Sequence, residues 1–129
     1  MKGIVPRFIE DIFQSGNAKS ILLQMNLIEN EEVFDLLDPP SVYPAKHIFG
    51  YSKTLGALNF ISKTVHVGNA AQAKETLGCG LSAACSLFVH KNRPFSAAAC
   101  HLVTTVVVIR SDETVSVVDF VELADLLYI

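Results

Sequence analysis

Residues Lys91 to His101 read Lys-Asn-Arg-Pro-Phe-Ser-Ala-Ala-Ala-Cys-His, and an apolar run follows from Leu102 to Ile109. A short polar turn, Arg110 to Thr114, separates this run from a second apolar run at Val115 to Phe120. Two runs rich in β-branched residues on either side of a polar turn predict an antiparallel hairpin that begins at His101. Both faces of the second strand are largely apolar, which is typical of a strand buried in the middle of a sheet.

A helix is predicted over residues 70–86, upstream of that hairpin. Asn69 offers a side-chain oxygen as an N-cap, and Gln72 follows three residues later, as in a capping box. Gly78 and Gly80 lie inside this segment and weaken it, so we expect them to bend the helix or to end it early.

The remaining elements are predicted from apolar periodicity and from turn-forming residues. Pro6 suits the first turn of a helix, and Gly16 suits its end. The full set comprises a helix over 5–15, a strand over 21–28, a compact turn and short segment over 29–38, at most short strands within 41–57, and a strand over 58–67. No repeat interrupts the chain, so we treat residues 1–129 as one domain.

Composition limits the classes of protein to which this chain can belong. Its 129 residues are 50% hydrophobic and 18% charged, which argues against a disordered tail. The net charge of −3, with no cluster of Lys or Arg, gives no basis for nucleic-acid binding. No apolar run reaches the roughly 20 residues that span a bilayer. Three cysteines without a CxxC pair indicate a reducing compartment, so we expect a cytoplasmic protein.

The loop and hairpin resemble the switch I and switch II regions of the kinesin motor domain family, which read N-x-x-S-S-R-S-H and D-L-A-G-S-E. Three more phrases follow the family's order. Gly3 to Arg7 resembles G-I-I-P-R, Glu29 to Pro39 resembles E-I-Y-N-E-x-V-x-D-L-L-D-P, and Leu58 to Leu87 resembles the strand and helix before switch I. The resemblance implies the middle third of a motor domain. The expected fold is therefore a partial kinesin-like α/β structure, related to P-loop NTPases, with a mixed sheet of about four strands and flanking helices, one on each face or nearby.

The chemistry of that family is not retained at the matching positions. Ala97 to Ala99 stand where kinesins have Ser, Ser and Arg, and Ala124 stands where they have the switch II glutamate. The resemblance implies that this arginine and glutamate pair with each other, so both partners of the ion pair are missing. Glu122 replaces the switch II glycine and would repel phosphate. The remnant switch positions are Ser96, His101 and Asp119, and we interpret Asp119 as a solvated or capping residue at a strand end.

Phosphate binding also lacks its loop. No G-x-x-x-x-G-K-[ST] motif occurs in the sequence, and its amides and lysine are what hold the phosphates of ATP. The segment His47 to Thr54 echoes such a loop but lacks the spaced glycines that allow the backbone amides to gather. We expect no ATPase activity, no bound cofactor and no metal.

A zinc site is the other chemistry that the residue types allow, but their spacing matches no common finger. The candidates are Cys79, Cys85, His90, Cys100 and His101. Cys100 and His101 cannot act as a nucleophile and its base on one strand, because neighbouring side chains point to opposite faces. We interpret the cysteines as small core residues and His101 as a core or hairpin histidine.

Three functional hypotheses follow. The first is a catalytically inactive kinesin-like module, a pseudo-motor that binds microtubules or a partner kinesin and is associated with the cytoskeleton. In kinesins the lobe matching residues 41–57 touches tubulin, but here it carries only Lys46 and Lys53. The second is a truncated fragment of a motor ATPase with no independent activity. The third is an unrelated small α/β enzyme.

The strand 115–120 carries a further expectation about partners. The resemblance implies that its outer neighbour in a kinesin is the phosphate-loop strand, which this sequence does not contain. An apolar edge without Lys or Pro is a template for pairing with another chain. We therefore predict a homo-oligomer, a partner strand or aggregation at this edge. The alternative is that the tail Leu123 to Ile129 folds over part of the edge.

Overall fold

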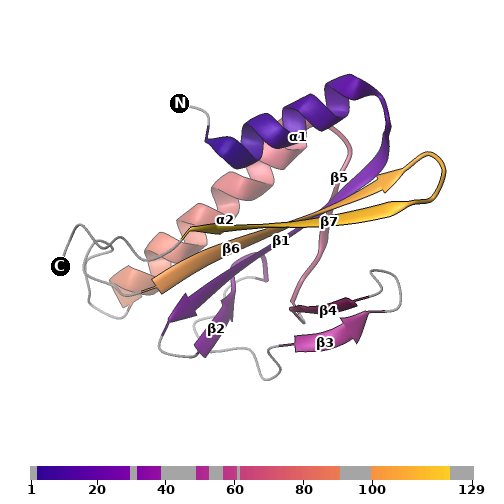
Figure 1. The fold of residues 1–129 in the computed structure, drawn as a ribbon. Helices are drawn as coiled ribbons and strands as arrows, with labels where there is room; N and C mark the ends of the chain where they lie inside the picture. The colour runs from indigo at the N-terminus through magenta and orange to yellow at the C-terminus, as the bar shows by residue number, and fades with distance from the viewer. Residues whose placement is uncertain are drawn as a thin grey trace.

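The computed structural model describes residues 3–29, 32–38, 49–52, 57–60, 62–90 and 100–122 (Figure 1). The elements in chain order are α1 (Ile4–Ser15), β1 (Ala18–Glu29), β2 (Glu32–Asp35), β3 (Phe49–Ser52), β4 (Ala57–Phe60), β5 (Val65–Val67), α2 (Ala70–His90), β6 (Cys100–Arg110) and β7 (Val115–Glu122). The α/β class expected from the sequence is confirmed.

The main sheet has five strands in the order β2-β1-β6-β7, with β5 also paired to β1. Both β2 and β5 lie on the edge of β1 that faces away from β6, one beside each half of the strand. Every pairing among the described strands is antiparallel. The strands β3 and β4 form a separate two-stranded sheet.

Both helices lie on the same face of the main sheet, where they contact β1 and each other (Figure 1). Side chains of β1 alternate between the faces, and Ile21, Leu23 and Met25 point into the core beneath the helices. Phe8 of α1 packs edge-on against Phe120 of β7, with ring centroids 5.3 Å apart. Of the two arrangements expected, one helix on each face or helices nearby, the two described helices do not show the first, because both lie on one face.

The first helix begins and ends as its sequence predicts. It spans Ile4–Ser15, and Gly16 follows it with φ of 74°, in the left-handed region that glycine enters without strain. The Gly16 N–H donates to the Phe13 carbonyl at 3.2 Å, which satisfies one of the last carbonyls of the helix.

The second helix confirms the predicted cap but not the predicted weakness. The Gln72 N–H donates to Asn69 Oδ1 at 2.9 Å, while Gln72 Oε1 accepts from the Gly68 N–H at 2.7 Å. The helix continues through both glycines to His90. Gly80 is buried directly over Met25, so the absence of a side chain there lets the helix approach the sheet closely.

Two other boundaries differ from the expected ones. The segment 58–67 is not one strand, because β4 ends at Phe60 and β5 begins at Val65. The compact turn and short segment expected over 29–38 contain the strand β2, which pairs with the end of β1. The expected short strand within 41–57 is confirmed by β3. The tail beyond Glu122 lies outside the described residues.

Candidate functional site

The predicted hairpin holds the most informative polar contact of the sheet. Thr105 of β6 lies directly opposite Asp119 of β7, and both side chains point to the face that the helices do not cover, which we call the open face. The Thr105 hydroxyl donates to Asp119 Oδ1 at 2.6 Å. Thr105 is fully buried and Asp119 is exposed, so the carboxylate satisfies a hydroxyl that water does not reach.

The remnant switch positions are placed only in part. Asp119 lies inside β7, which runs on to Glu122, rather than at a strand end. Its side chain is exposed, as expected of a solvated residue, and it also accepts a hydrogen bond from Thr105 that was not expected. His101 is half-buried near the start of β6, on the same open face. Four residues of strand, about 13 Å, separate it from Thr105, so the sheet does not bring His101 to Asp119. Ser96 lies outside the described residues.

Thr105 is the site residue that the sequence interpretation missed. The signal was available in the hairpin turn, because a turn between Arg110 and Thr114 pairs residues counted equally outward from its two ends. Five steps outward on each side reach Thr105 and Asp119.

A second polar cluster lies on the open face of β1. Gln24 and Asn26 are both buried there, although their polarity suggests a solvated face. Gln24 Nε2 donates to Thr64 Oγ1 at 3.0 Å, and Asn26 Nδ2 donates to Ser62 Oγ at 3.2 Å. The Lys63 N–H donates to Asp35 Oδ2 at 2.6 Å. These bonds fasten the connection between β4 and β5 to β1 and β2, and they account for the break in the segment expected as one strand.

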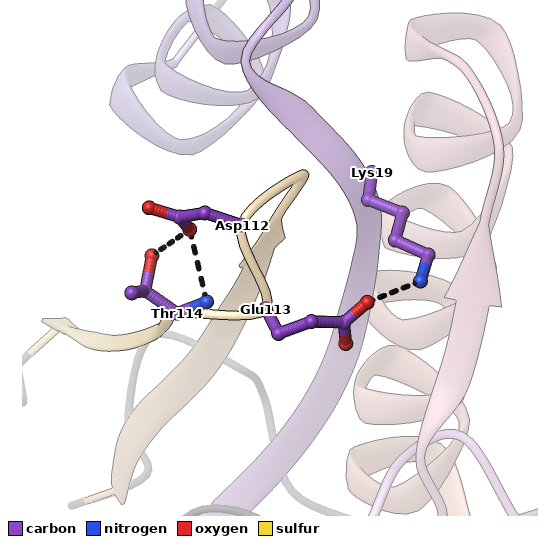
Figure 2. Close-up of polar contacts among 4 residues, drawn as sticks. All are labelled: Lys19, Asp112, Glu113 and Thr114. Carbon is purple, nitrogen blue, oxygen red and sulfur yellow. Dashed lines mark hydrogen bonds and ion pairs between the residues drawn. The ribbon is translucent and has the colours of Figure 1, made fainter.

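The turn of the hairpin is fixed by a local network (Figure 2). Asp112 Oδ1 accepts from the Thr114 hydroxyl at 2.6 Å and from the Thr114 N–H at 3.0 Å. These two bonds lower the pKa of Asp112, the hydroxyl bond contributing most. Glu113 adopts a left-handed φ of 70° and reaches Lys19 Nζ at 2.6 Å, so the turn is tied to the start of β1. Both side chains of this ion pair are exposed, which limits it to about 0.2–1 kcal/mol.

The zinc hypothesis gains no geometric support in the described part of the chain. Cys79 and Cys85 are exposed free thiols on α2 and not the small core residues expected. Cys100 and His101 are adjacent on one strand, as expected. Among the described residues, no group of three His, Cys, Asp or Glu side chains is placed to hold a metal ion. No described helix is long and apolar enough to cross a membrane.

Two kinesin structures are among the solved structures that match this fold. The first is a fast kinesin, described for its ATPase mechanism and its interactions with microtubules, with a TM-score of 0.70 and 19% identity over 95% of this chain. The second is a structure from a description of mutants that reveal a signalling pathway for activation of the kinesin motor ATPase. Its TM-score is 0.67, with 17% identity over 96% of this chain. The fold is that of part of a kinesin motor domain.

The chain spans 36% and 37% of the two kinesin chains that it matches. No family model matches the sequence, and no curated protein sequence matches it either. The structural likeness therefore carries the comparison, and at below 20% identity it establishes the fold alone. The expected partial kinesin-like fold is confirmed on this ground.

Proposed function

We propose that this chain is a kinesin-like module that acts by binding a cytoskeletal protein and does not hydrolyse ATP. The observation that carries the proposal is a kinesin-type fold over 95% of the chain, combined with a sequence that lacks the family's reactive residues. The third hypothesis, an unrelated enzyme, requires that the likeness to kinesin is accidental. A match over 95% of the chain argues against such an accident.

Inactivity is supported by the side chains that flank the two hairpin strands. Hydrolysis depends on charges that stabilise the transferred phosphoryl group, and Ala99 and Ala124 supply none. Glu122 adds a negative charge at the end of β7, where the resemblance places the glycine amide that meets the γ-phosphate. Asp119 is already engaged with Thr105.

Calorimetric titration with Mg-ATP and Mg-ADP tests the inactive part of the proposal. We expect no heat of binding at cellular nucleotide concentrations. Low-micromolar affinity for either nucleotide would refute it. The double substitution Ala99→Arg with Ala124→Glu serves as a control, and it should not restore hydrolysis, because residues 1–129 contain no phosphate-loop motif to accompany the restored pair.

Microtubules are the binding partner that the resemblance favours. The strand β3 lies within the segment 41–57, which the resemblance matches to the tubulin-contacting lobe of kinesins. The segment 41–57 carries two lysines, Lys46 and Lys53, against the acidic surface expected of tubulin. With so few positive charges, binding should be weak and should fall steeply with salt.

Co-sedimentation with microtubules at low and at high salt tests this partner. We expect salt-sensitive binding that the double substitution Lys46→Ala with Lys53→Ala removes. Lys74→Ala, on the exposed surface of α2, is the matched control and should leave binding unchanged. Binding that is absent at low salt would eliminate microtubules and leave a kinesin or scaffold as the cytoskeletal partner.

The second candidate function is a motor fragment with no independent activity. It is favoured by the share of the matched kinesins that the chain covers, little more than a third. A fragment of this kind should bind neither microtubules nor a kinesin, so failure of both binding assays would select it. Under the first proposal, the protein should instead be found in the cytoplasm with the cytoskeleton.

A further inference from the structure

The outer edge of β7 presents its backbone groups in a defined pattern. The Arg110 N–H donates to the Thr114 carbonyl at 2.9 Å, which makes these two residues a hydrogen-bonded pair of the hairpin. Hydrogen-bonded and non-bonded pairs alternate along an antiparallel ladder. The even-numbered residues of β7 therefore bond to β6, and the backbone groups of the odd-numbered residues point outward: Val115, Val117, Asp119 and Val121.

Among the described strands, none pairs with this edge, because β7 ends the order of the main sheet. The side chains of the same odd-numbered residues point to the open face, and Val115, Val117 and Val121 are exposed by 37%, 39% and 52%. Natural edge strands are usually protected by Lys, Pro or a bulge. β7 contains no Lys, Pro or bulge, and its register with β6 is unbroken. Asp119 is the one charged side chain among its outward-facing residues.

We propose that a second copy of this chain pairs antiparallel with the outer edge of β7, with Val117 opposite Asp119 of the second copy. The resulting dimer has a two-fold axis through Val118 and joins the two sheets into one. The proposal goes beyond the proposed function, and either can fail without the other.

The register follows from the order of side chains along β7. Pairing Val117 with Asp119 uses all four outward-facing residues and sets Val115 against Val121 of the second copy, a favourable pair of β-branched side chains. On the helix-covered face it sets the small Ser116 opposite the large Phe120. A shift by one pair in one direction places the two Asp119 carboxylates face to face, and like charges directly opposite are unfavourable. A shift in the other direction places Val121 against Glu113 and Val115 against Asp119.

A second copy is favoured over an unrelated strand because β7 is complementary to itself in this register. Each Asp119 lies directly opposite Val117 of the second copy, so no charged side chain lies directly opposite a like charge within the paired segment. The two Asp119 side chains are diagonal neighbours, about 7–8 Å apart. The two-fold symmetry also closes the assembly, since each copy uses up its only β7 edge.

Sedimentation velocity of the full chain across a range of concentrations tests the dimer. We expect a species of twice 14.0 kDa at tens of micromolar. Val117→Lys puts a charge at the centre of the edge and should abolish this species, with circular dichroism confirming that the variant is folded. Leu81→Lys is the matched control, because Leu81 is an exposed apolar residue of α2 away from the edge, and it should leave the dimer intact.

Disulfide trapping tests the register, in a background where Cys79, Cys85 and Cys100 are serine. Val118→Cys should cross-link, because the two copies of residue 118 form a non-bonded pair with Cα atoms about 4.5 Å apart, within disulfide range. Val117→Cys should not, because its own copy lies diagonally at about 7–8 Å. Residue-level hydrogen exchange tests the same pairing on the unmodified chain. The amides of Val117, Asp119 and Val121 should become protected as concentration rises.

A monomer at every concentration would overturn the proposal, as would a dimer that Val117→Lys leaves intact. Cross-linking at residue 117 instead of residue 118 would overturn the register. Open-ended aggregation instead of a discrete dimer would contradict the closed two-fold pairing.

Discussion

On the face of the sheet that α1 and α2 cover, Leu23 and Val106 lie in an apolar core, whereas on the open face Asn26 and Thr105 are equally buried but polar. The covered face derives its stability from close packing beneath the helices. The open face depends on hydrogen bonds to Ser62 and Asp119. Substitutions on the covered face should therefore lower stability by creating cavities. Substitutions on the open face should lower it by leaving buried polar groups without hydrogen bonds.

The largest effect is expected at the centre of the covered face. Leu23→Ala should lower the free energy of unfolding by about 2–5 kcal/mol, because the cavity lies beneath two packed helices and cannot collapse. Val121→Ala, on the exposed edge of the open face, should change it by no more than about 0.5 kcal/mol. Urea melts of both variants measure the difference. Similar losses in the two would mean that the open face is as tightly packed as the covered one.

The contact between α2 and the sheet is the next most sensitive point. A Cβ at Gly80 would overlap the present position of Met25 Sδ, and Met25 is itself buried, so Gly80→Ala should cost about 1–3 kcal/mol through overpacking. Gly78→Ala, in the same helix, meets nothing within 4 Å and should stabilise the protein by about 0.5–1 kcal/mol. Thermal melts should show shifts of opposite sign. A stabilising Gly80→Ala would show that the packing over Met25 is loose.

On the open face, replacing either partner of the hydrogen bond between Thr105 and Asp119 should lower the free energy of unfolding, but by different amounts. Asp119→Ala leaves the buried Thr105 hydroxyl without its acceptor and should cost about 1 kcal/mol or more. Thr105→Val keeps the shape of the side chain and leaves an exposed carboxylate that water can solvate, so it should cost less. Chemical denaturation of both variants and of the double variant measures the coupling. Equal costs for the two single variants would contradict the burial assigned to Thr105.

The smallest effect is expected at the hairpin turn, as a dependence of the free energy of unfolding on pH. The hydrogen bonds from Thr114 lower the pKa of Asp112 in the folded state below its usual value of 3.8. A lowered folded-state pKa gives stability that is present above the usual value and is lost as the pH falls through the folded-state pKa. Asp112→Asn should therefore be slightly less stable than the unmodified protein at neutral pH, and this difference should vanish in strong acid. A difference that grows on acidification would show the opposite sign of the shift.

The elements fixed by local chemistry could be predicted from the sequence. The Asn69 cap, the Gly16 stop and the hairpin around Arg110 to Thr114 each depend on residues that lie within a few positions of one another. The kinesin-like order of short motifs predicted the fold that the structural comparison then found.

The features that depend on distant partners could not be predicted in the same way. The break between β4 and β5 follows from bonds to Gln24 and Asn26, which lie far away in the sequence. Gly80 looks like a helix breaker until Met25 is placed beneath it. The hydrogen bond between Thr105 and Asp119 lies between these two cases. The residues are distant in sequence, but the turn alone determines the register that brings them together.

The position of β1 in the sheet also sets the order in which the chain can fold. β6 and β7 are joined by a short turn, whereas the ladder between β1 and β6 pairs Leu22 with Val107, across most of the chain. Closing so long a loop costs entropy before any contact compensates for it, while the hairpin forms at little such cost. During refolding, pulse-labelled amides of the hairpin should be protected before those that join β1 to β6. On a ribosome, β1 emerges before β6, so its apolar strand lacks this neighbour until β6 (Cys100–Arg110) has been synthesised.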